Sequence, residues 1–171
     1  DADTTVQTNI LGTMNLVNAC SRIEYDCFVN IGSSSEYGLK HYPMKETDVL
    51  EPRGDYAVSK ASATLYCLAV SRWEQRPIVT LRLFSPYGYY DALTRLVPFV
   101  IVSCLRGRNP KLLSREAVRD YIFIEDVLDV CIDTVRSRNA FGQILNVGSG
   151  EQHSVEEVVK KVIELTGSDV R

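Results

Sequence analysis

The sequence lacks the features that mark secreted, metal-binding and membrane proteins. Its five cysteines contain no C-x-x-C pair and are odd in number, so neither a zinc site nor a disulfide framework is predicted. No apolar run is long enough to cross a membrane, and no stretch has the pattern of a signal peptide. We therefore expect a protein of the reducing cytoplasm with no membrane partner.

An excess of positive charge is missing as well. The 171 residues carry a formal net charge of −3, which argues against a surface that coats nucleic acid. A composition of 45% hydrophobic and 24% charged residues is typical of a folded globular chain. This length suits one ordinary domain with a sizeable core.

Apolar runs and helical spacing alternate along the chain. Short apolar runs predict strands at 27–31, 79–84 and 144–147, with a further short strand at 121–124. Helical patterns occupy 5–22, 56–73, 93–106, 125–136 and a stretch that begins at Ser154, where Glu157 completes a capping box. This order predicts an α/β fold with parallel strands joined by helices. Ligands of such sheets bind beyond the carboxyl ends of the strands, where three polar turns of this chain lie.

Ser33, Tyr56 and Lys60 form the most informative group of polar residues. Tyr56 and Lys60 are four residues apart in a predicted helix, so they share one face. An ammonium group beside a phenol favours the phenolate form. Ser33 follows a predicted strand and can reach the same reacting oxygen. The three residues therefore predict a proton-transfer site.

Six segments in a fixed order resemble the extended short-chain dehydrogenase/reductase family, in particular its nucleotide-sugar epimerases, dehydratases and 4-keto reductases. Y-x-x-x-K alone is a weak signal, but the six together are specific. The segments are the N-x-x-G-T-x-x-L helix at 9–16, the serine loop at 32–38, Y-x-x-x-K at 56–60, L-R-L-F-S-P-Y-G at 81–88, V-R-D-Y-I at 118–122 and L-N-V-G-S-G at 145–150.

The resemblance implies the C-terminal part of a Rossmann-like doubly wound parallel sheet, together with part of a smaller sugar-nucleotide-binding subdomain. Residues 1–90 would form a partial NAD(P)-binding domain that carries the Ser/Tyr/Lys site. Residues 91–171 would supply substrate-binding elements and the last Rossmann strand at about 144–147.

The resemblance also assigns roles to individual residues. Ser33, Tyr56 and Lys60 would be catalytic, with Tyr56 as the general acid or base. Asn9 and Pro86, together with Tyr56 and Lys60, would contact the cofactor, NAD or NADP, with NAD favoured. The substrate, a nucleoside-diphosphate sugar, would contact Ser34, Ser35, Ser85, Arg95 and Arg119. Relatives often have asparagine where this chain has Ser85, so that contact departs from the family pattern.

The serine loop bears on the type of reaction. Sugar 4,6-dehydratases carry an acidic pair or a Ser-Glu pair directly after the catalytic Ser or Thr, and here Ser34 and Ser35 follow Ser33. This alignment favours an epimerase or a 4-keto reductase with hydride transfer at the sugar C4. If the loop is one residue shorter, Ser34 becomes the catalytic hydroxyl, Ser35-Glu36 follows it, and a 4,6-dehydratase results.

One family feature has no counterpart in the chain. No segment matches the G-x-x-G-x-x-G turn that holds the dinucleotide pyrophosphate, and the sequence begins at Asp1 without methionine. We therefore expect an internal fragment of a longer enzyme. A catalytically silent domain that binds a nucleotide sugar or a partner subunit is the alternative. In relatives, the helices at about 5–22 and 56–73 form a two-fold dimer interface, so a homodimer is expected.

Overall fold

The computed structural model describes residues 1–112 and 114–170, which form two compact units. Unit 1 contains residues 1–84 and 127–147. Unit 2 contains the described residues of 85–126 and 148–171. Helix α5 (Ile124–Arg136) begins in unit 2 and runs through unit 1.

Unit 1 is built on a parallel sheet of three strands, as the alternating pattern predicts. Strands β1 (Phe28–Ser33), β2 (Ile78–Leu83) and β6 (Ile144–Val147) lie in the order β1-β2-β6. Leu81 of the central strand is in register with Ile31 on one side and Leu145 on the other. Ile78, Val79 and Leu81 are almost completely buried, as expected for the central strand of a parallel sheet that is covered on both faces.

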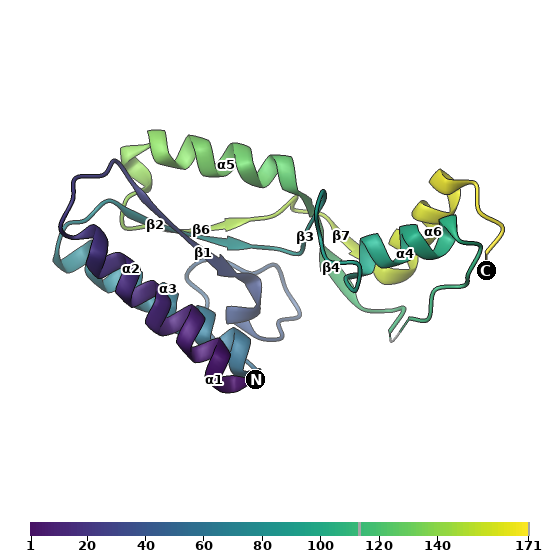
Figure 1. The fold of residues 1–171 in the computed structure, drawn as a ribbon, viewed down its shortest axis with the longest axis horizontal. Helices are drawn as coiled ribbons and strands as arrows, with labels where there is room; N and C mark the ends of the chain where they lie inside the picture. The colour runs from purple at the N-terminus through teal and green to yellow at the C-terminus, as the bar shows by residue number, and fades with distance from the viewer. Residues whose placement is uncertain (113, 171) are drawn as a thin grey trace. The chain divides into compact units, whose positions relative to one another are not determined.

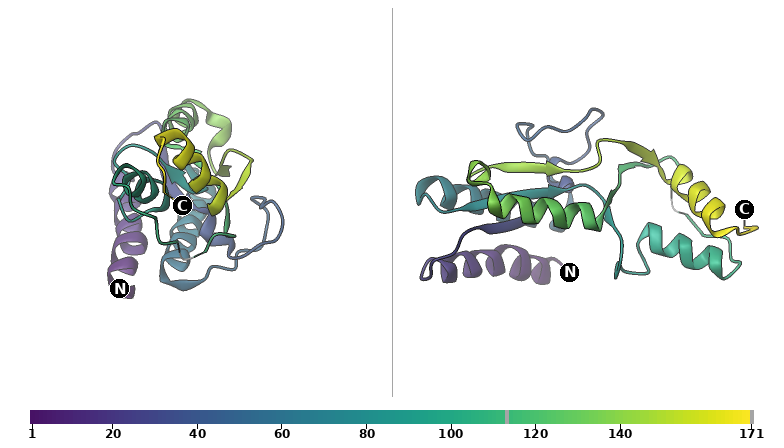
Figure 2. Two further views of the ribbon diagram at one scale, coloured as in Figure 1. Left: turned by 90° about the vertical axis from the view of Figure 1, so that its right-hand side faces the viewer. Right: turned by 90° about the horizontal axis from the view of Figure 1, so that it is seen from above.

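Helices cover both faces of this sheet (Figures 1 and 2). The first helix is continuous from α1 (Ala2–Thr5) through the π-helical segment Val6–Leu11 to α2 (Gly12–Cys20), and it lies beside α3 (Gly54–Trp73). Helix α5 lies on the opposite face. Small residues of α3, including Ala57, Ser59, Ala61 and Ala63, are buried and allow its close approach to the sheet.

Unit 2 is built from two short strand pairs and two helices. Strands β3 (Pro86–Tyr87) and β5 (Ile122–Phe123) pair in parallel, whereas β4 (Val118–Asp120) and β7 (Gln152–Ser154) are antiparallel. Helices α4 (Leu96–Leu105) and α6 (Val155–Thr166) share a core. The buried members of that core are Val100, Cys104, Val155, Val159 and Val162. Helix α6 begins with the predicted capping box of Ser154 and Glu157.

Several local features differ from the sequence expectations. The first helix begins at Ala2 and ends at Cys20, and its π-helical segment was not expected. The strand expected at 121–124 is shortened to Ile122–Phe123. Strands β3, β4 and β7 were not expected, because two or three residues are too few to show an alternating pattern. Among the described residues, no helix has the length and apolar character needed to cross a membrane.

Candidate functional site

The serine loop forms a tight turn at the carboxyl end of β1. Ser33 is extended (φ −147°, ψ 143°) and caps the 3₁₀ turn η2 (Ser34–Tyr37). Its Oγ accepts hydrogen bonds from the amide of Ser35 at 3.2 Å and from the hydroxyl of Ser35 at 2.8 Å. In the other direction, the amide of Ser33 donates to Glu36 Oε1 at 2.8 Å. Two reciprocal contacts therefore hold the Ser33 backbone and hydroxyl in place.

Tyr56 and Lys60 lie on the first turns of α3, next to the end of β1. The Nζ of Lys60 donates to the carbonyl of Ile31 at 2.9 Å, which ties α3 to the strand two residues before Ser33. Partial burial lowers the pKa of the Lys60 ammonium group below its ordinary value, while the charge of Glu36 acts in the opposite direction. Tyr56 is 53% exposed. A half-buried ammonium and an open phenol thus share one helix face.

Asn9 is linked to the same turn of α3 through Ser59. Asn9 Nδ2 donates to Ser59 Oγ at 2.9 Å, and Ser59 Oγ donates to the carbonyl of Tyr56 at 2.9 Å. Asn9 lies within the π-helical segment, a geometry that is frequent at functional sites. The structure therefore brings together Asn9, Tyr56 and Lys60, as the sequence predicts, and adds Ser59 between them.

A buried polar network lies beneath the serine turn. Glu36 is 0% exposed, and its carboxylate accepts from Arg82 Nε at 2.8 Å and from Thr64 Oγ1 at 3.1 Å. Arg82 Nη1 donates to the hydroxyl of Tyr37 at 2.9 Å, and this hydroxyl donates to Asn146 Oδ1 at 2.7 Å. Burial raises the pKa of Tyr37, which keeps the phenol protonated.

Sequence reasoning missed this network, although Glu36, Tyr37, Arg82 and Asn146 lie in the recognised motifs. The available signal was Arg82 itself. A single arginine inside the apolar run of β2 has to find a buried partner, because an unpaired charge in a sheet interior is very costly.

In unit 2, four predicted site residues line a single pocket of about 590 Å³. These are Ser85, Pro86, Arg95 and Arg119. Lys111, which was not predicted, adds a third cationic side chain. Apolar and aromatic side chains complete the lining and include Tyr87, Leu96, Phe99, Leu112 and Tyr121. Three cationic groups beside apolar surface suit an anionic ligand with a flat apolar part.

The cationic side chains of this pocket differ in how firmly they are held. Arg95 Nε pairs with Asp91 Oδ1 at 3.3 Å. Arg119 Nη1 donates to the carbonyl of Val118 at 3.1 Å. The next residue, Asp120, accepts hydrogen bonds from the amides of Ser149 and Gly150 at 2.8 and 3.0 Å. This carboxylate fixes the strand that carries Arg119 against the glycine turn after β6.

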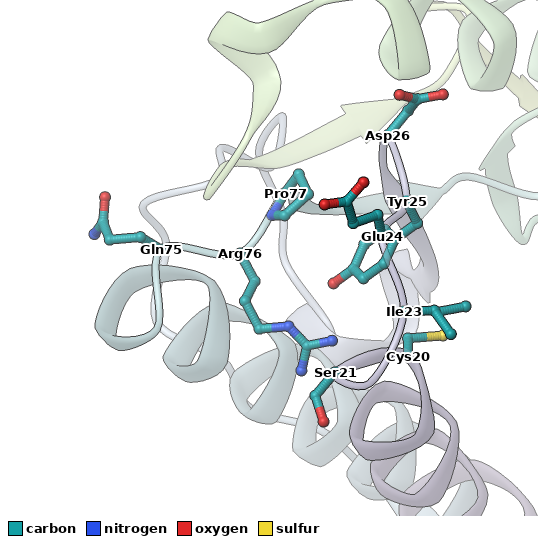
Figure 3. A pocket seen from close by; sticks show the side chains of 9 residues that line it. All are labelled: Cys20, Ser21, Ile23, Glu24, Tyr25, Asp26, Gln75, Arg76 and Pro77. Carbon is teal, nitrogen blue, oxygen red and sulfur yellow. The ribbon is translucent and has the colours of Figure 1, made fainter.

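A second hollow, of about 550 Å³, lies before the amino ends of β1 and β2, far along the sheet from Ser33 (Figure 3). Arg76 occupies one side: its guanidinium lies 5.5 Å from the ring centre of Tyr25 and donates to the carbonyl of Val17 at 3.0 Å. Within the described part of the chain, the hydroxyl of Tyr25 is the buried side-chain polar atom that has no hydrogen-bond partner. None of the predicted site residues lines this hollow.

Comparisons with known proteins identify relatives of the chain in sequence and in fold. A dTDP-glucose 4,6-dehydratase of Streptomyces griseus is 30% identical over 171 residues, which are 99% of this chain and 52% of that protein. The crystal structure of UDP-glucuronic acid 4-epimerase from Bacillus cereus, in complex with UDP-glucuronic acid and NAD, has a TM-score of 0.90 at 27% identity. That match covers 96% of this chain and 53% of the other.

A dTDP-glucose 4,6-dehydratase from Bacillus anthracis, in complex with NAD, has a TM-score of 0.87 at 28% identity and covers 96% of this chain and 55% of that chain. This chain therefore spans about half the length of these relatives. The family model described as NAD dependent epimerase/dehydratase matches residues 1–148, which include all the predicted site residues of both units. The chain belongs to the NAD-dependent epimerase/dehydratase family.

Proposed function

We propose that the protein acts on a nucleoside-diphosphate sugar and interconverts a hydroxyl and a ketone at the sugar C4, as an epimerase or a 4-keto reductase. The observation that carries this proposal is the grouping of Ser33, Tyr56 and Lys60 at the carboxyl end of the parallel sheet. The contact between Lys60 and Ile31 supports it, because it joins the Tyr56 helix to the strand that ends in Ser33.

In this proposal, Tyr56 transfers the proton at the sugar oxygen. Its exposed phenol is open to a ligand, and the ammonium of Lys60 lies four residues further along the same helix face. Both hydrogen bonds between Ser33 and Ser35 use Ser33 Oγ as the acceptor, which leaves the Ser33 proton for the sugar oxygen. Ser34 and Ser35 border the same turn and would contact the sugar.

The residues present fit the nicotinamide-ribose part of NAD. Lys60 offers a half-buried ammonium donor, and the relay from Asn9 through Ser59 fixes the backbone at Tyr56. We assign cofactor contacts to Asn9, Tyr56, Lys60 and Pro86, and we favour NAD because structures of two relatives contain it. NAD, when bound, accepts and returns the hydride. The chain has no G-x-x-G-x-x-G segment for the pyrophosphate.

The burial of Glu36 supports epimerase or reductase chemistry over dehydration. A dehydratase assignment would need the Ser35-Glu36 pair to face the substrate. Instead, the Glu36 carboxylate is turned into the interior and bound to Ser33, Thr64 and Arg82. A 4,6-dehydratase remains the second candidate because a relative with 30% identity carries that name. A product that has lost a water molecule would identify it by mass spectrometry.

The pocket of unit 2 would hold the nucleoside diphosphate. Arg95, Lys111 and Arg119 can neutralise the diphosphate, and a planar guanidinium suits bidentate binding of its oxygens. The side chains of Leu96 and Phe99 offer apolar surface to the base or ribose. Unit 1 would thus supply the proton-transfer groups and unit 2 the nucleotide site.

Five free thiols suit a reducing compartment, and we propose the cytoplasm.

Substitution of Tyr56 by Phe tests the catalytic assignment. Loss of the hydroxyl should lower kcat by a factor of about 10²–10⁴, because that is the usual contribution of a general acid or base. Binding of the nucleotide sugar should change little. Turnover would be measured on the intact protein by cofactor fluorescence or product analysis. Tyr66→Phe, on the same helix but bonded to Asn18, is the control. Near-normal turnover in the Tyr56 variant would contradict the assignment of Tyr56 as the general acid or base.

Substitution of Arg119 by Met tests the nucleotide site. A hydrogen bond to a charged group contributes about 1.5–3 kcal/mol, so affinity for the nucleoside diphosphate should fall by roughly tenfold to a hundredfold. Isothermal titration calorimetry with UDP and dTDP measures this change. Arg108→Met, an exposed arginine of the same unit outside the pocket lining, should leave affinity unchanged. Equal affinities in the two variants would argue against the site.

Substitution of Lys60 by Met should lower turnover and make stability depend on pH in a different way, because it removes both the buried ammonium and its hydrogen bond to Ile31. Because burial lowers the folded-state pKa of Lys60, its charged form carries a desolvation cost in the folded protein at neutral pH. That cost decreases as the pH rises through the folded-state pKa towards 10.5, the ordinary pKa of a lysine side chain. The pH-dependent part of the stability change, a gain over the unsubstituted protein, should therefore be largest near pH 7 and shrink towards pH 10.5.

Urea unfolding at several pH values measures this gain. Lys161→Met, which removes an exposed lysine paired with Glu164, is the control and should change stability little at any pH. A gain that grows with pH would contradict the assigned cause.

We also propose a homodimer that forms through the first helix and α3. Both helices expose large apolar side chains, including Leu16, Val58 and Leu65, and contiguous exposed apolar surface indicates an interaction site. A two-fold interface would bury these side chains against their own copies. Leu65→Glu should then shift the protein to monomer in sedimentation velocity, because it places a charge in the interface. Leu39→Glu, at an equally exposed loop leucine, should leave the assembly unchanged.

A further inference from the structure

The buried pair of Glu36 and Arg82 is a costly way to hold a fold together. Arg82 is 1% exposed and Glu36 is 0% exposed, so both charges are removed from water. A buried ion pair of this kind is often no more stabilising than two apolar side chains of the same volume. Stability alone therefore does not account for the pair, and its contacts show what else it does.

One end of the pair acts on Ser33. Glu36 Oε1 accepts from the Ser33 amide at 2.8 Å and from Thr64 Oγ1 at 3.1 Å, while Oε2 accepts from Arg82 Nε at 2.8 Å. Arg82 thus sets where the carboxylate lies, and the carboxylate sets where the Ser33 backbone lies. Ser33 in turn accepts the Ser35 amide, so the pair controls the whole turn.

Gly32 makes room for this arrangement. It lies opposite Arg82 on the neighbouring strand. A Cβ atom at position 32 would lie 2.6 Å from Glu36 Oε1 and 3.2 Å from Arg82 Cγ. The pair therefore passes directly across the backbone of β1, one residue before Ser33.

The other end of the pair reaches the third strand and a distant loop. Arg82 donates to the hydroxyl of Tyr37, and its guanidinium carbon lies 4.6 Å from the ring centre. Tyr37 donates to Asn146 on β6, and Asn146 Nδ2 donates to the carbonyl of Met44 at 3.0 Å. A continuous series of contacts therefore runs from Ser33 to the loop at 44–46.

We propose that Glu36 and Arg82 are a positioning pair, which sets the Ser33 hydroxyl for its reaction by fixing the turn from below. The proposal rests on the proposed function of Ser33, but the geometry of the turn can be measured without a substrate. Catalytic groups have to be held within about 0.5 Å of their productive positions, which a short turn does not achieve without support from the groups packed beneath it.

Two double variants separate positioning from stability. Glu36→Leu/Arg82→Met removes both charges and the acceptor for the Ser33 amide. Glu36→Gln/Arg82→Met also removes both charges but keeps an acceptor oxygen at that place. Neither leaves an unpaired buried charge, so both should fold, and circular dichroism with urea unfolding checks this.

The first readout is amide hydrogen exchange at Ser33 and Ser35, measured by NMR with Leu81 as an internal reference for global opening. In the Leu/Met variant, exchange at both serines should be faster by about tenfold or more relative to Leu81, because the Ser33 amide loses its acceptor and the Ser35 amide is bonded to Ser33. In the Gln/Met variant, exchange at Ser33 should be slower than in the Leu/Met variant, because Thr64 still holds an acceptor oxygen there, but faster than in the unsubstituted protein, because Arg82 is lost. Unchanged exchange in the Leu/Met variant would overturn the proposal.

The second readout is steady-state turnover of a nucleotide sugar. The Leu/Met variant should lose roughly tenfold to a hundredfold in kcat with KM unchanged, since small displacements of reacting groups have effects of that size. The Gln/Met variant should recover part of the loss, because it restores the acceptor for the Ser33 amide but not the contact from Arg82. If the two variants differ in amide exchange at Ser33 but have equal kcat, the pair has no role in the reaction. If the unsubstituted protein has no turnover, the proposed function fails, and the exchange result still decides whether the pair holds the turn.

Discussion

The ion pair between Glu36 and Arg82 is the interaction on which the site of unit 1 depends. The pair connects the serine turn to β2. Thr64 of α3 donates a hydrogen bond to Glu36, and Tyr37, which accepts from Arg82, donates to Asn146 of β6. All three strands of the sheet are therefore fixed to one another at the end where the proton-transfer residues lie. Because a buried charge is tolerated only with its partners in place, these contacts form together or not at all.

Much of this fold can be predicted from the apolar runs of the sequence. The three parallel strands follow from short runs at 27–31, 79–84 and 144–147, and the Tyr56–Lys60 face follows from their spacing. The pairing of Arg82 with Glu36 was not predictable in this way, because the partners are far apart in sequence and periodicity says nothing about which residues meet. The antiparallel pair of β4 and β7 was missed for the same reason: only long-range contact creates it.

Counting residues in the serine loop left two alignments open, and the direction of the Glu36 side chain supports the one that we propose. A carboxylate that faces substrate and one that supports a turn occupy neighbouring positions in sequence, but they need opposite orientations. Glu36 is turned inward and bound by an arginine, so it is unsuited to proton transfer with a substrate. In unit 2, by contrast, Arg119 stays at a pocket surface while Asp120 beside it anchors the strand.

The π-helical segment of the first helix has a consequence for helix register. Asn9 bonds to Ser59 and Asn18 bonds to Tyr66, so nine residues on one helix span the same distance as seven on α3. At about 100° per residue, an ideal α-helix would place the two asparagines on opposite sides. The wider turn of Val6–Leu11 takes up about one residue and reduces this mismatch. The segment thus acts as a one-residue insertion that the helix absorbs without losing either contact.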